Sequence, residues 1–227
     1  MSITTENYLK TIYAYSESHD AQMVPLGEVA RSLGVTPGTV TTMMKSLADA
    51  GLVEYLPRKG VTLTRSGRTE ALGVVRRHRL IELFLVEILG LDWADVHDEA
   101  EVLEHAMSDR LLSRIDELLG YPESDPHGDP IPGPDGLLPK QAGLPLAEAP
   151  VASTVRIVRV EHEETGFLSF LSETGLTPGA EVGVVDRSSA AGTVTVSVSG
   201  ERLSLSVQTA RKIRVQIVYS GSSEERS

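Results

Sequence analysis

Six side chains suited to binding a divalent metal recur at helical spacing in the middle of the chain. They are His78, Glu82, His97, Glu101, Glu104 and His105. Positions i and i+3 or i+4 lie on one face of an α-helix, so two expected helices would each present imidazole beside carboxylate. Divalent transition ions accept these nitrogen and oxygen ligands. A solvated acidic helix with incidental histidines is the alternative, but three of the six histidines in register with carboxylates favour a metal site.

The chain contains no cysteine. Disulfides, thiolate zinc sites and cysteine nucleophiles are therefore excluded. A metal must be held by nitrogen and oxygen, which favours Mn, Fe(II), Co, Ni or Zn over softer ions. No apolar run reaches the length of about 18 residues that a bilayer span needs, and the first ten residues lack the pattern of a signal peptide. We expect a cytoplasmic protein.

The net charge of −11 is unusual for a nucleic-acid-binding protein, but the acid is unevenly distributed. Residues 1–72 carry seven basic and seven acidic side chains, whereas residues 73–121 carry five basic and eleven acidic ones. The first segment is therefore neutral and can approach DNA phosphates. The acid is concentrated where the candidate metal ligands lie.

Two long helices are expected to position these ligands, one over residues 65–89 and one from about residue 92 to Gly120. An apolar stripe at helical spacing supports the second helix. The stripe consists of Val96, Ala100, Leu103, Met107, Leu111, Ile115 and Leu118. We expect the apolar faces of both helices, including Leu83, Phe84 and Leu111, to form a dimer contact.

The N-terminal segment predicts a winged helix-turn-helix. A first amphipathic helix carries Tyr8, Leu9, Ile12 and Tyr13, and a short second helix ends at Gly34. Thr36 and Pro37 then cap a third helix, and two short strands flank a basic turn. A helix of this kind reads the major groove, and a basic wing binds phosphate or the minor groove. The candidate DNA-binding residues are Thr36, Pro37, Gly38, Thr39, Thr41, Thr42, Arg58 and Lys59.

The remaining chain predicts a linker followed by a small β-barrel. Residues 121–150 are rich in Pro and Gly, which indicates irregular structure. Alternating strand patterns follow at 155–160, 181–185, 193–198 and 213–218, with a short helix over 167–173. The fold class is mainly α with a small β domain. The expected boundaries are 1–72 for DNA binding, 73–140 for dimerisation and metal binding, 141–150 for a linker, 151–219 for the barrel and 220–227 for a disordered tail.

The run from His97 to Asp109, with 77–80 upstream and 128–133 downstream, resembles the diphtheria-toxin-repressor family of metalloregulators. The resemblance extends from Thr4 to about Val218 and is greatest to the three-domain, manganese-responsive branch. It implies a dimeric repressor that binds palindromic operator DNA to control metal-uptake genes. It further implies a winged-helix domain, a helical dimerisation and metal domain, and an SH3-like (FeoA-like) C-terminal domain.

The resemblance also implies two metal sites in each subunit. The primary site would use Asn7, Glu101, Glu104 and His105. The ancillary site would use His78, Glu82 and His97, completed by Glu161 and Glu164, with His162 or Glu163 as substitutes.

The chain departs from the family pattern at several positions. Iron-type members have cysteine at the position of Glu101 and methionine at that of Asn7. Oxygen in place of sulfur favours Mn²⁺, with Fe²⁺ as the alternative. Manganese-type members usually have aspartate at position 7, so the neutral amide predicts weaker affinity. Lys10 replaces a second acid of the compact two-domain sensors, and Asp125 and Asp129 stand at the anion-binding positions, so we expect neither a binuclear site nor a bound anion there.

Two other functions remain open. A helical di-metal enzyme would also use Glu-x-x-His motifs, but it requires them on two helices, and the chain has one related run, Glu101 to His105. A metal-independent winged-helix regulator would bind its operator whether or not a chelator is present.

Overall fold

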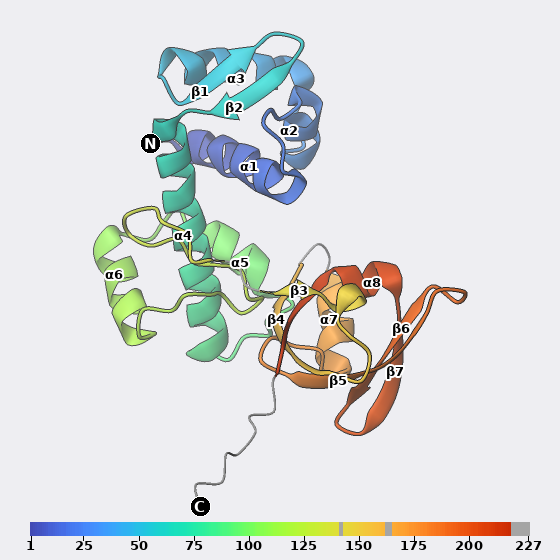
Figure 1. The fold of residues 1–227 in the computed structure, drawn as a ribbon. Coiled ribbons are helices and arrows are strands. Elements are labelled where there is room, and N and C mark those ends of the chain that lie inside the picture. The colour runs from blue at the N-terminus through green and yellow to red at the C-terminus, as the bar shows by residue number, and fades with distance from the viewer. Residues whose placement is uncertain (141–142, 162–164, 219–227) are drawn as a thin grey trace, which may run out of the picture. The chain divides into compact units, whose positions relative to one another are not determined.

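The computed structural model describes residues 1–140, 143–161 and 165–218. The chain divides into two compact units (Figure 1). Unit 1 comprises residues 1–81, 101–118 and 131–138, and unit 2 comprises residues 82–100, 119–130 and 139–227. The expected tail at 220–227 and the first two linker residues, 141–142, lie outside the described residues.

Unit 1 begins with the predicted three helices. They are α1 (Ile3–His19), α2 (Leu26–Ser32) and α3 (Pro37–Asp49), drawn in blue in Figure 1. The apolar residues that predicted α1 are all buried, at 4% exposure or less. They share one core with Val40, Met44 and Leu47 of α3. Helices α1 and α3 are therefore packed into the same hydrophobic core.

The wing is a two-stranded antiparallel hairpin of β1 (Val53–Leu56) and β2 (Gly60–Leu63). Lys59 N donates to Leu56 O at 3.0 Å, closing a turn with Pro57 and Arg58 at its centre. Arg58 has φ +67°, the left-handed conformation that a type II turn requires at this position and that usually selects glycine. The predicted hairpin is present, with a strained arginine at its tip.

Helix α4 (Arg65–Glu87) follows the wing, as predicted. The second expected long helix is instead two helices, α5 (Val96–Leu103) and α6 (Asp109–Leu118). Ala106 N and Met107 N both bond to Leu103 O, which ends α5, and Ser108 Oγ accepts from Leu111 N at 3.3 Å to begin α6. The prediction of one continuous helix was wrong because a serine cap followed by Asp109 starts a new helix. Glu104 and His105 therefore lie in the turn after α5.

Unit 2 contains a six-stranded antiparallel sheet in the order β3-β8-β4-β5-β6-β7. The predicted strands are present as β4 (Thr154–Val160), β5 (Glu181–Ser188), β6 (Thr193–Val198) and β8 (Ile213–Ile217), with α7 (Thr165–Glu173) as the short helix. The sequence reading missed β7 (Glu201–Ser206) and α8 (Val207–Arg211). β7 pairs with β6 throughout its length.

The segment before the sheet is more ordered than an irregular linker. β3 (Leu144–Pro145) pairs with β8, and a 3-10 turn, η1 (Leu146–Glu148), follows it. Leu146, Ala147 and Ala149 are buried in the core of the sheet. Residues 144–149 therefore belong to the C-terminal domain.

Candidate metal centre and DNA-binding surface

The ammonium group of Lys10 on α1 lies among three of the predicted metal ligands in unit 1. Its Nζ is 2.6 Å from Glu101 Oε1, 2.8 Å from Glu104 Oε2 and 3.1 Å from His78 Nδ1. His78 Nδ1 is also 2.7 Å from Glu104 Oε2. A cationic group of the protein itself therefore sits where these carboxylates and the imidazole converge.

Glu104 is the most buried acid of this cluster, with 1% of its surface exposed. Burial alone would raise the pKa of its carboxyl. The hydrogen bond with His78 and the charge and hydrogen bond of Lys10 outweigh burial, so that the pKa lies below its usual value of 4.5. Glu104 is therefore held as a carboxylate, the form that binds a cation.

Three polar atoms of the predicted primary ligands are buried and have no hydrogen-bond partner. They are Asn7 Oδ1, Glu104 Oε1 and His105 Nε2. The last two lie 3.2 Å apart without hydrogen-bond geometry. Buried polar atoms normally have hydrogen-bond partners, and an exception indicates a bound water or ion or a functional role. These atoms belong to three of the four predicted primary ligands, and an amide oxygen, a carboxylate oxygen and an imidazole nitrogen suit a divalent transition ion.

Two hydrogen bonds in series, from Arg77 to Glu6 and from His105 to Glu6, orient the ring of His105. Arg77 on α4 holds Glu6 Oε1 at 2.9 Å, and Glu6 Oε2 lies 2.7 Å from His105 Nδ1. A carboxylate can only accept here, so Nδ1 is the donor to Glu6, and Nε2 is the ring nitrogen that can bind a metal. Metal-binding histidines usually have this arrangement, with the second ring nitrogen fixed by a carboxylate or carbonyl.

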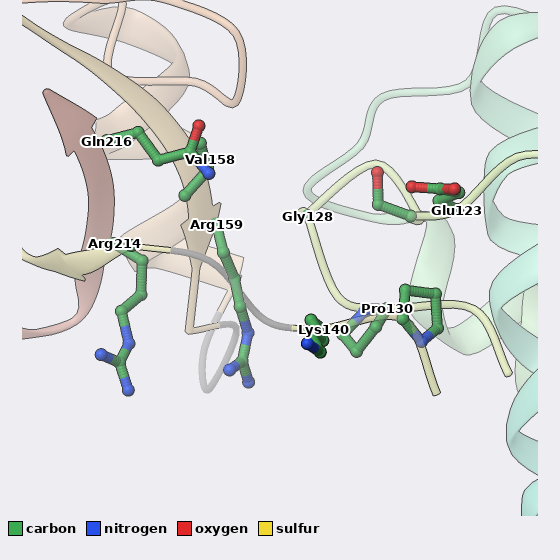
Figure 2. Close-up of a pocket in the computed structure, with 11 residues that line it drawn as sticks. Glu123, Gly128, Pro130, Lys140, Val158, Arg159, Arg214 and Gln216 are labelled. Atoms are coloured by element: carbon green, nitrogen blue, oxygen red, sulfur yellow. The ribbon is translucent and has the colours of Figure 1, made fainter. Parts of the chain in front are cut away.

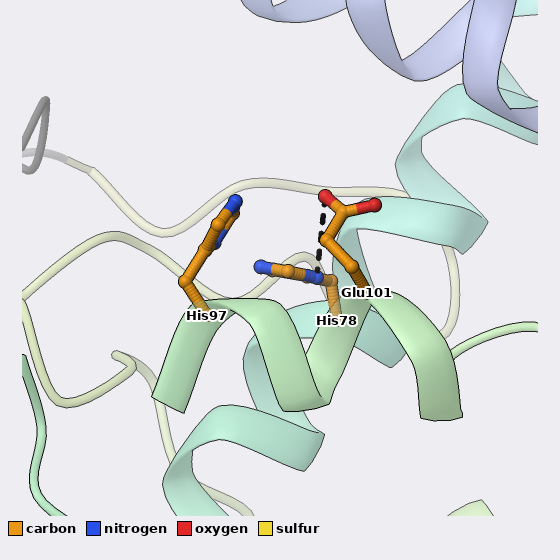
Figure 3. A group of neighbouring side chains, drawn as sticks. All are labelled: His78, His97 and Glu101. Carbon is orange, nitrogen blue, oxygen red and sulfur yellow. Dashed lines mark ion pairs between the residues drawn. The ribbon is translucent and has the colours of Figure 1, made fainter. Parts of the chain in front are cut away.

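The predicted ancillary ligands contact several different residues. Figure 3 shows His97 one turn before Glu101 on α5, and His78 of α4 with its Nδ1 4.0 Å from Glu101 Oε1. In unit 2, His97 Nδ1 lies 3.2 Å from Glu82 Oε1. Glu161 contributes a backbone bond to Lys212 O, and Glu164, like His162 and Glu163, lies outside the described residues. The ancillary set remains a prediction.

Unit 2 holds a group that the sequence reading did not include. Glu82, Asp125 and His127 are all buried, and each offers a ligand atom within 4.8 Å of the others. His127 Nε2 donates to Trp93 O at 2.9 Å, which leaves Nδ1 as the nitrogen able to bind a metal. Asp125 Oδ1 accepts from the backbone N–H groups of His127 and Asp129. The loop thus fixes both residues beside Glu82.

Four residues of these groups were not assigned to a metal centre from the sequence, for different reasons. Lys10 and Glu6 are distant in sequence from the side chains they contact. Asp125 and His127 lie in a segment whose Pro and Gly content indicated a linker. The alternation Asp125-x-His127-x-Asp129 was the available signal, since such residues in an ordered loop can bind a metal.

The proposed recognition helix presents small hydroxyl residues at its N-terminus. Thr36 Oγ1 caps the helix by accepting from Thr39 N at 3.2 Å. Thr41 and Thr42 donate their hydroxyl groups to the carbonyl groups of Pro37 and Gly38. Thr36, Pro37, Gly38 and Thr39 are exposed, as are the wing residues Arg58 and Lys59. The predicted DNA-binding residues are thus accessible on α3 and at the tip of the wing.

Comparison with known families assigns the three parts of the chain. Residues 1–61 match the N-terminal DNA binding domain of the iron dependent repressors, and residues 64–133 match their metal binding and dimerisation domain. Residues 144–217 match the FeoA domain. The described helices include none that is long and apolar enough to cross a membrane.

Whole-length relatives agree with this assignment. The iron-dependent repressor IdeR of Mycobacterium leprae is 34% identical over 95% of this chain and 97% of its own. The diphtheria toxin repressor of Corynebacterium diphtheriae is 35% identical over 94% of this chain and 96% of its own. A solved manganese-dependent transcriptional repressor with bound manganese is 39% identical, with a TM-score of 0.83 over 94% of this chain and all of that one.

The winged helix, helical metal domain and C-terminal sheet define a metal-dependent DNA-binding repressor rather than an enzyme. The chain belongs to the diphtheria-toxin-repressor family. Proteins of this class bind operator DNA as dimers, and the chain has both the DNA-binding and the dimerisation domain.

Proposed function

We propose that this chain is a manganese-activated repressor that acts in the cytoplasm on palindromic operators of metal-uptake genes, with Fe²⁺ as the alternative activator. The observation that carries the proposal is the set of unpartnered buried atoms, Asn7 Oδ1, Glu104 Oε1 and His105 Nε2. We place domain boundaries near residues 72 and 140, as the sequence predicts.

The primary site would use Asn7, Glu101, Glu104 and His105. Glu6 and Arg77 orient the imidazole of His105 through its Nδ1. The contacts with His78 and Lys10 keep Glu104 ionised in spite of its burial. Lys10 Nζ donates hydrogen bonds to Glu101 Oε1 and Glu104 Oε2. The ammonium must therefore move away from any of these oxygens that binds a metal. A bound divalent ion supplies the positive charge that joins these ligands and offsets the local acid.

Oxygen ligands support manganese as the activating metal. Glu101 and Asn7 offer oxygen where iron-type members have sulfur, and hard oxygen ligands suit Mn²⁺. The solved manganese-dependent repressor is among the most similar structures. A relative named for iron is 34% identical, and this similarity keeps Fe²⁺ as the alternative.

A second ion in each subunit is supported by the unit 2 group. Glu82 and His97, two predicted ancillary ligands, are in contact, and Glu82 also lies with Asp125 and His127. We propose that Asp125 and His127 join the ancillary ligands. Glu161 and Glu164 remain candidates to complete the site, and His78 is the residue of the predicted set that faces the Lys10 cluster.

The metal site and the recognition helix share the core of unit 1. Asn7 and Lys10 are on α1, whose Leu9 and Ile12 pack in the core that contains Val40 of α3. Docking of α1 therefore biases the position of α3, which presents Thr36, Thr39 and Thr42 for base or phosphate contact. Arg58 and Lys59 add phosphate affinity, and the strained φ of Arg58 is consistent with a functional position.

Operator binding by Glu104→Gln tests the proposal, with Glu99→Gln as the control. Glu99 is an exposed acid of α5, so its loss removes one charge without touching the cluster. In saturating Mn²⁺ we expect Glu104→Gln to bind operator at least tenfold more weakly, while Glu99→Gln binds like the wild type. Metal-dependent binding that is unchanged in Glu104→Gln would contradict the site, and wild-type binding that ignores a chelator would favour a metal-independent regulator.

A further inference from the structure

A basic cavity lies in unit 2, between strands β4 and β8 of the sheet and the loops that cross their ends. Its volume is about 380 Å³, and it is lined by Lys140, Arg159 and Arg214, with Glu123 as its acidic lining residue. Figure 2 shows the two guanidinium groups on one side of the strands and Lys140 on the neighbouring loop. None of the lining residues is a candidate metal ligand. In a chain of net charge −11, this concentration of cations needs an explanation.

A β-bulge creates the arginine pair. The register of β4 and β8 passes from Ile157↔Val215 to Arg159↔Arg214, so that Val158 is the extra residue. Without the bulge, Val158 would lie opposite Arg214. With it, two arginines are direct cross-strand neighbours, an arrangement that is destabilising for like charges. Bulges commonly re-aim a side chain toward a site.

The acids of the described residues compensate this charge only in part. Asp129 Oδ1 lies 2.6 Å from Arg159 Nε, so one arginine has a buried carboxylate beside it. Across residues 1–140, 143–161 and 165–218, no ion pair is found for Arg214 or Lys140. Glu123 also lines the cavity, so three cations face two acids, and a net positive charge remains that an anion can neutralise.

The backbone around the cavity is held by close contacts. Gly128 has φ +86°, and a Cβ there would lie 2.0 Å from Val158 O, at the bulged residue. Val160 N donates to His127 O at 2.9 Å, which joins the same loop to β4. The loop can pack this closely on the bulge only because residue 128 is glycine. The cavity is therefore preorganised, which reduces the entropy lost on binding.

We propose that this cavity binds a small, multiply charged oxyanion, such as a phosphate or polycarboxylate compound. The planar guanidinium groups of Arg159 and Arg214 suit bidentate contact with its oxygens, and Lys140 adds a third positive charge. Binding relieves the repulsion within the arginine pair and stabilises the C-terminal domain. The residues that would hold the anion are none of the proposed metal ligands, and the proposal does not rest on the proposed function.

Thermal unfolding of the full chain tests the proposal, with inorganic phosphate and citrate as probes and sodium chloride at equal ionic strength as the reference. We expect at least one probe to raise the Tm by about 3 °C at ten times its Kd. Arg214→Gln should abolish this rise and, because it removes the like-charge pair, should raise the Tm of the anion-free chain. Arg202→Gln, at an exposed arginine of β7, should keep the wild-type response.

Which probe acts distinguishes phosphate from polycarboxylate ligands. A response that survives in Arg214→Gln would overturn the site, as would the absence of any response beyond that to chloride. Stabilisation by duplex DNA without operator sequence, in the absence of any effect of phosphate or citrate, would also overturn it and would assign the arginines to nucleic-acid binding.

Discussion

At the scale of single residues, Glu104 carries two roles on its two carboxylate oxygens. Oε2 contacts Lys10 and His78, whereas Oε1 has no hydrogen-bond partner. The first set of contacts stabilises the metal-free fold, and the second oxygen is available to a metal. Lys10 therefore stabilises the metal-free chain through Glu104 Oε2. It also holds Glu101 Oε1, so it competes with a metal for that predicted ligand.

Replacement of Lys10 by methionine should separate these two roles. Removing one partner of a buried ion pair leaves Glu104 uncompensated, so we expect the metal-free chain to lose on the order of 3 kcal/mol of unfolding free energy. The same change should tighten Mn²⁺ binding by about tenfold, because no ammonium has to be displaced. Urea unfolding without metal and calorimetric titration with Mn²⁺ measure the two effects. Lys10→Arg keeps the charge and serves as the control; weaker Mn²⁺ binding in Lys10→Met would contradict the competition.

The lowered pKa of Glu104 predicts how the stability of the metal-free chain depends on pH. Because the folded-state pKa lies below the usual 4.5, the carboxylate contributes stability that is present above pH 4.5 and is lost as the pH falls through the folded-state pKa. The difference in unfolding free energy between wild type and Glu104→Gln should therefore shrink as the pH falls below 4.5 and through the folded-state pKa. Urea denaturation with chelator measures it. A difference that is constant with pH would show that Glu104 is not held as a carboxylate.

Part of this centre could be predicted from sequence, and part could not. Helical spacing indicated the His and Glu ligands, and the family resemblance added Asn7. Lys10 could not be placed from spacing, because it reaches Glu101 and Glu104 across more than 90 residues. The pairing of Asp125 and His127 with Glu82 depends likewise on a loop conformation that side-chain to backbone bonds determine.

At the scale of elements, local signals predicted most helices and strands, and tertiary contacts decided the exceptions. The caps of α3 and the alternation in β4 and β6 are local features, and the structure contains them. The apolar stripe from Val96 to Leu118 continued across the end of α5, so the stripe alone did not reveal the break. Strand β7 has a weak pattern of its own and forms because it pairs with β6.

Alanine substitutions at two glycines of α4 should change the unfolding free energy in opposite directions. A Cβ at Gly67 would lie 1.9 Å from Leu52 O, whereas nothing lies within 4 Å of one at Gly73. Gly67→Ala must displace the backbone and should lower the unfolding free energy by about 3 kcal/mol or more. Gly73→Ala should raise it by up to about 1 kcal/mol, through helix propensity. Thermal or urea unfolding compares them, and equal effects would contradict the close packing at Gly67.

At the scale of the whole molecule, the helical domain leaves apolar side chains for a partner subunit. Val102, Leu111 and Leu118 are 72%, 49% and 61% exposed in the single chain, whereas Leu83 is 7% exposed. Of the residues expected at the dimer contact, Leu111 is therefore accessible and Leu83 packs within its own chain. Exposed apolar residues on one domain are typical of an interaction surface.

We predict that α6 contributes to the dimer interface, and Leu118→Glu should then weaken the dimer because it would bury a carboxylate there. We expect a shift toward monomer mass at micromolar concentration in light scattering, together with loss of operator binding. Leu137→Glu, at a residue 71% exposed in the loop 131–138, should remain dimeric. Dimerisation that persists unchanged in Leu118→Glu would place the interface elsewhere.

The central claim is that a divalent ion joins α1 to the turn after α5 and so activates DNA binding. Anomalous diffraction from crystals of the manganese-loaded chain tests it most directly. We expect a manganese peak at bonding distance from Asn7 Oδ1, Glu104 Oε1 and His105 Nε2, with the ammonium of Lys10 displaced from Glu101 Oε1. Manganese found only in the Glu82, Asp125 and His127 group, with Lys10 still bound to Glu101 and Glu104, would contradict it.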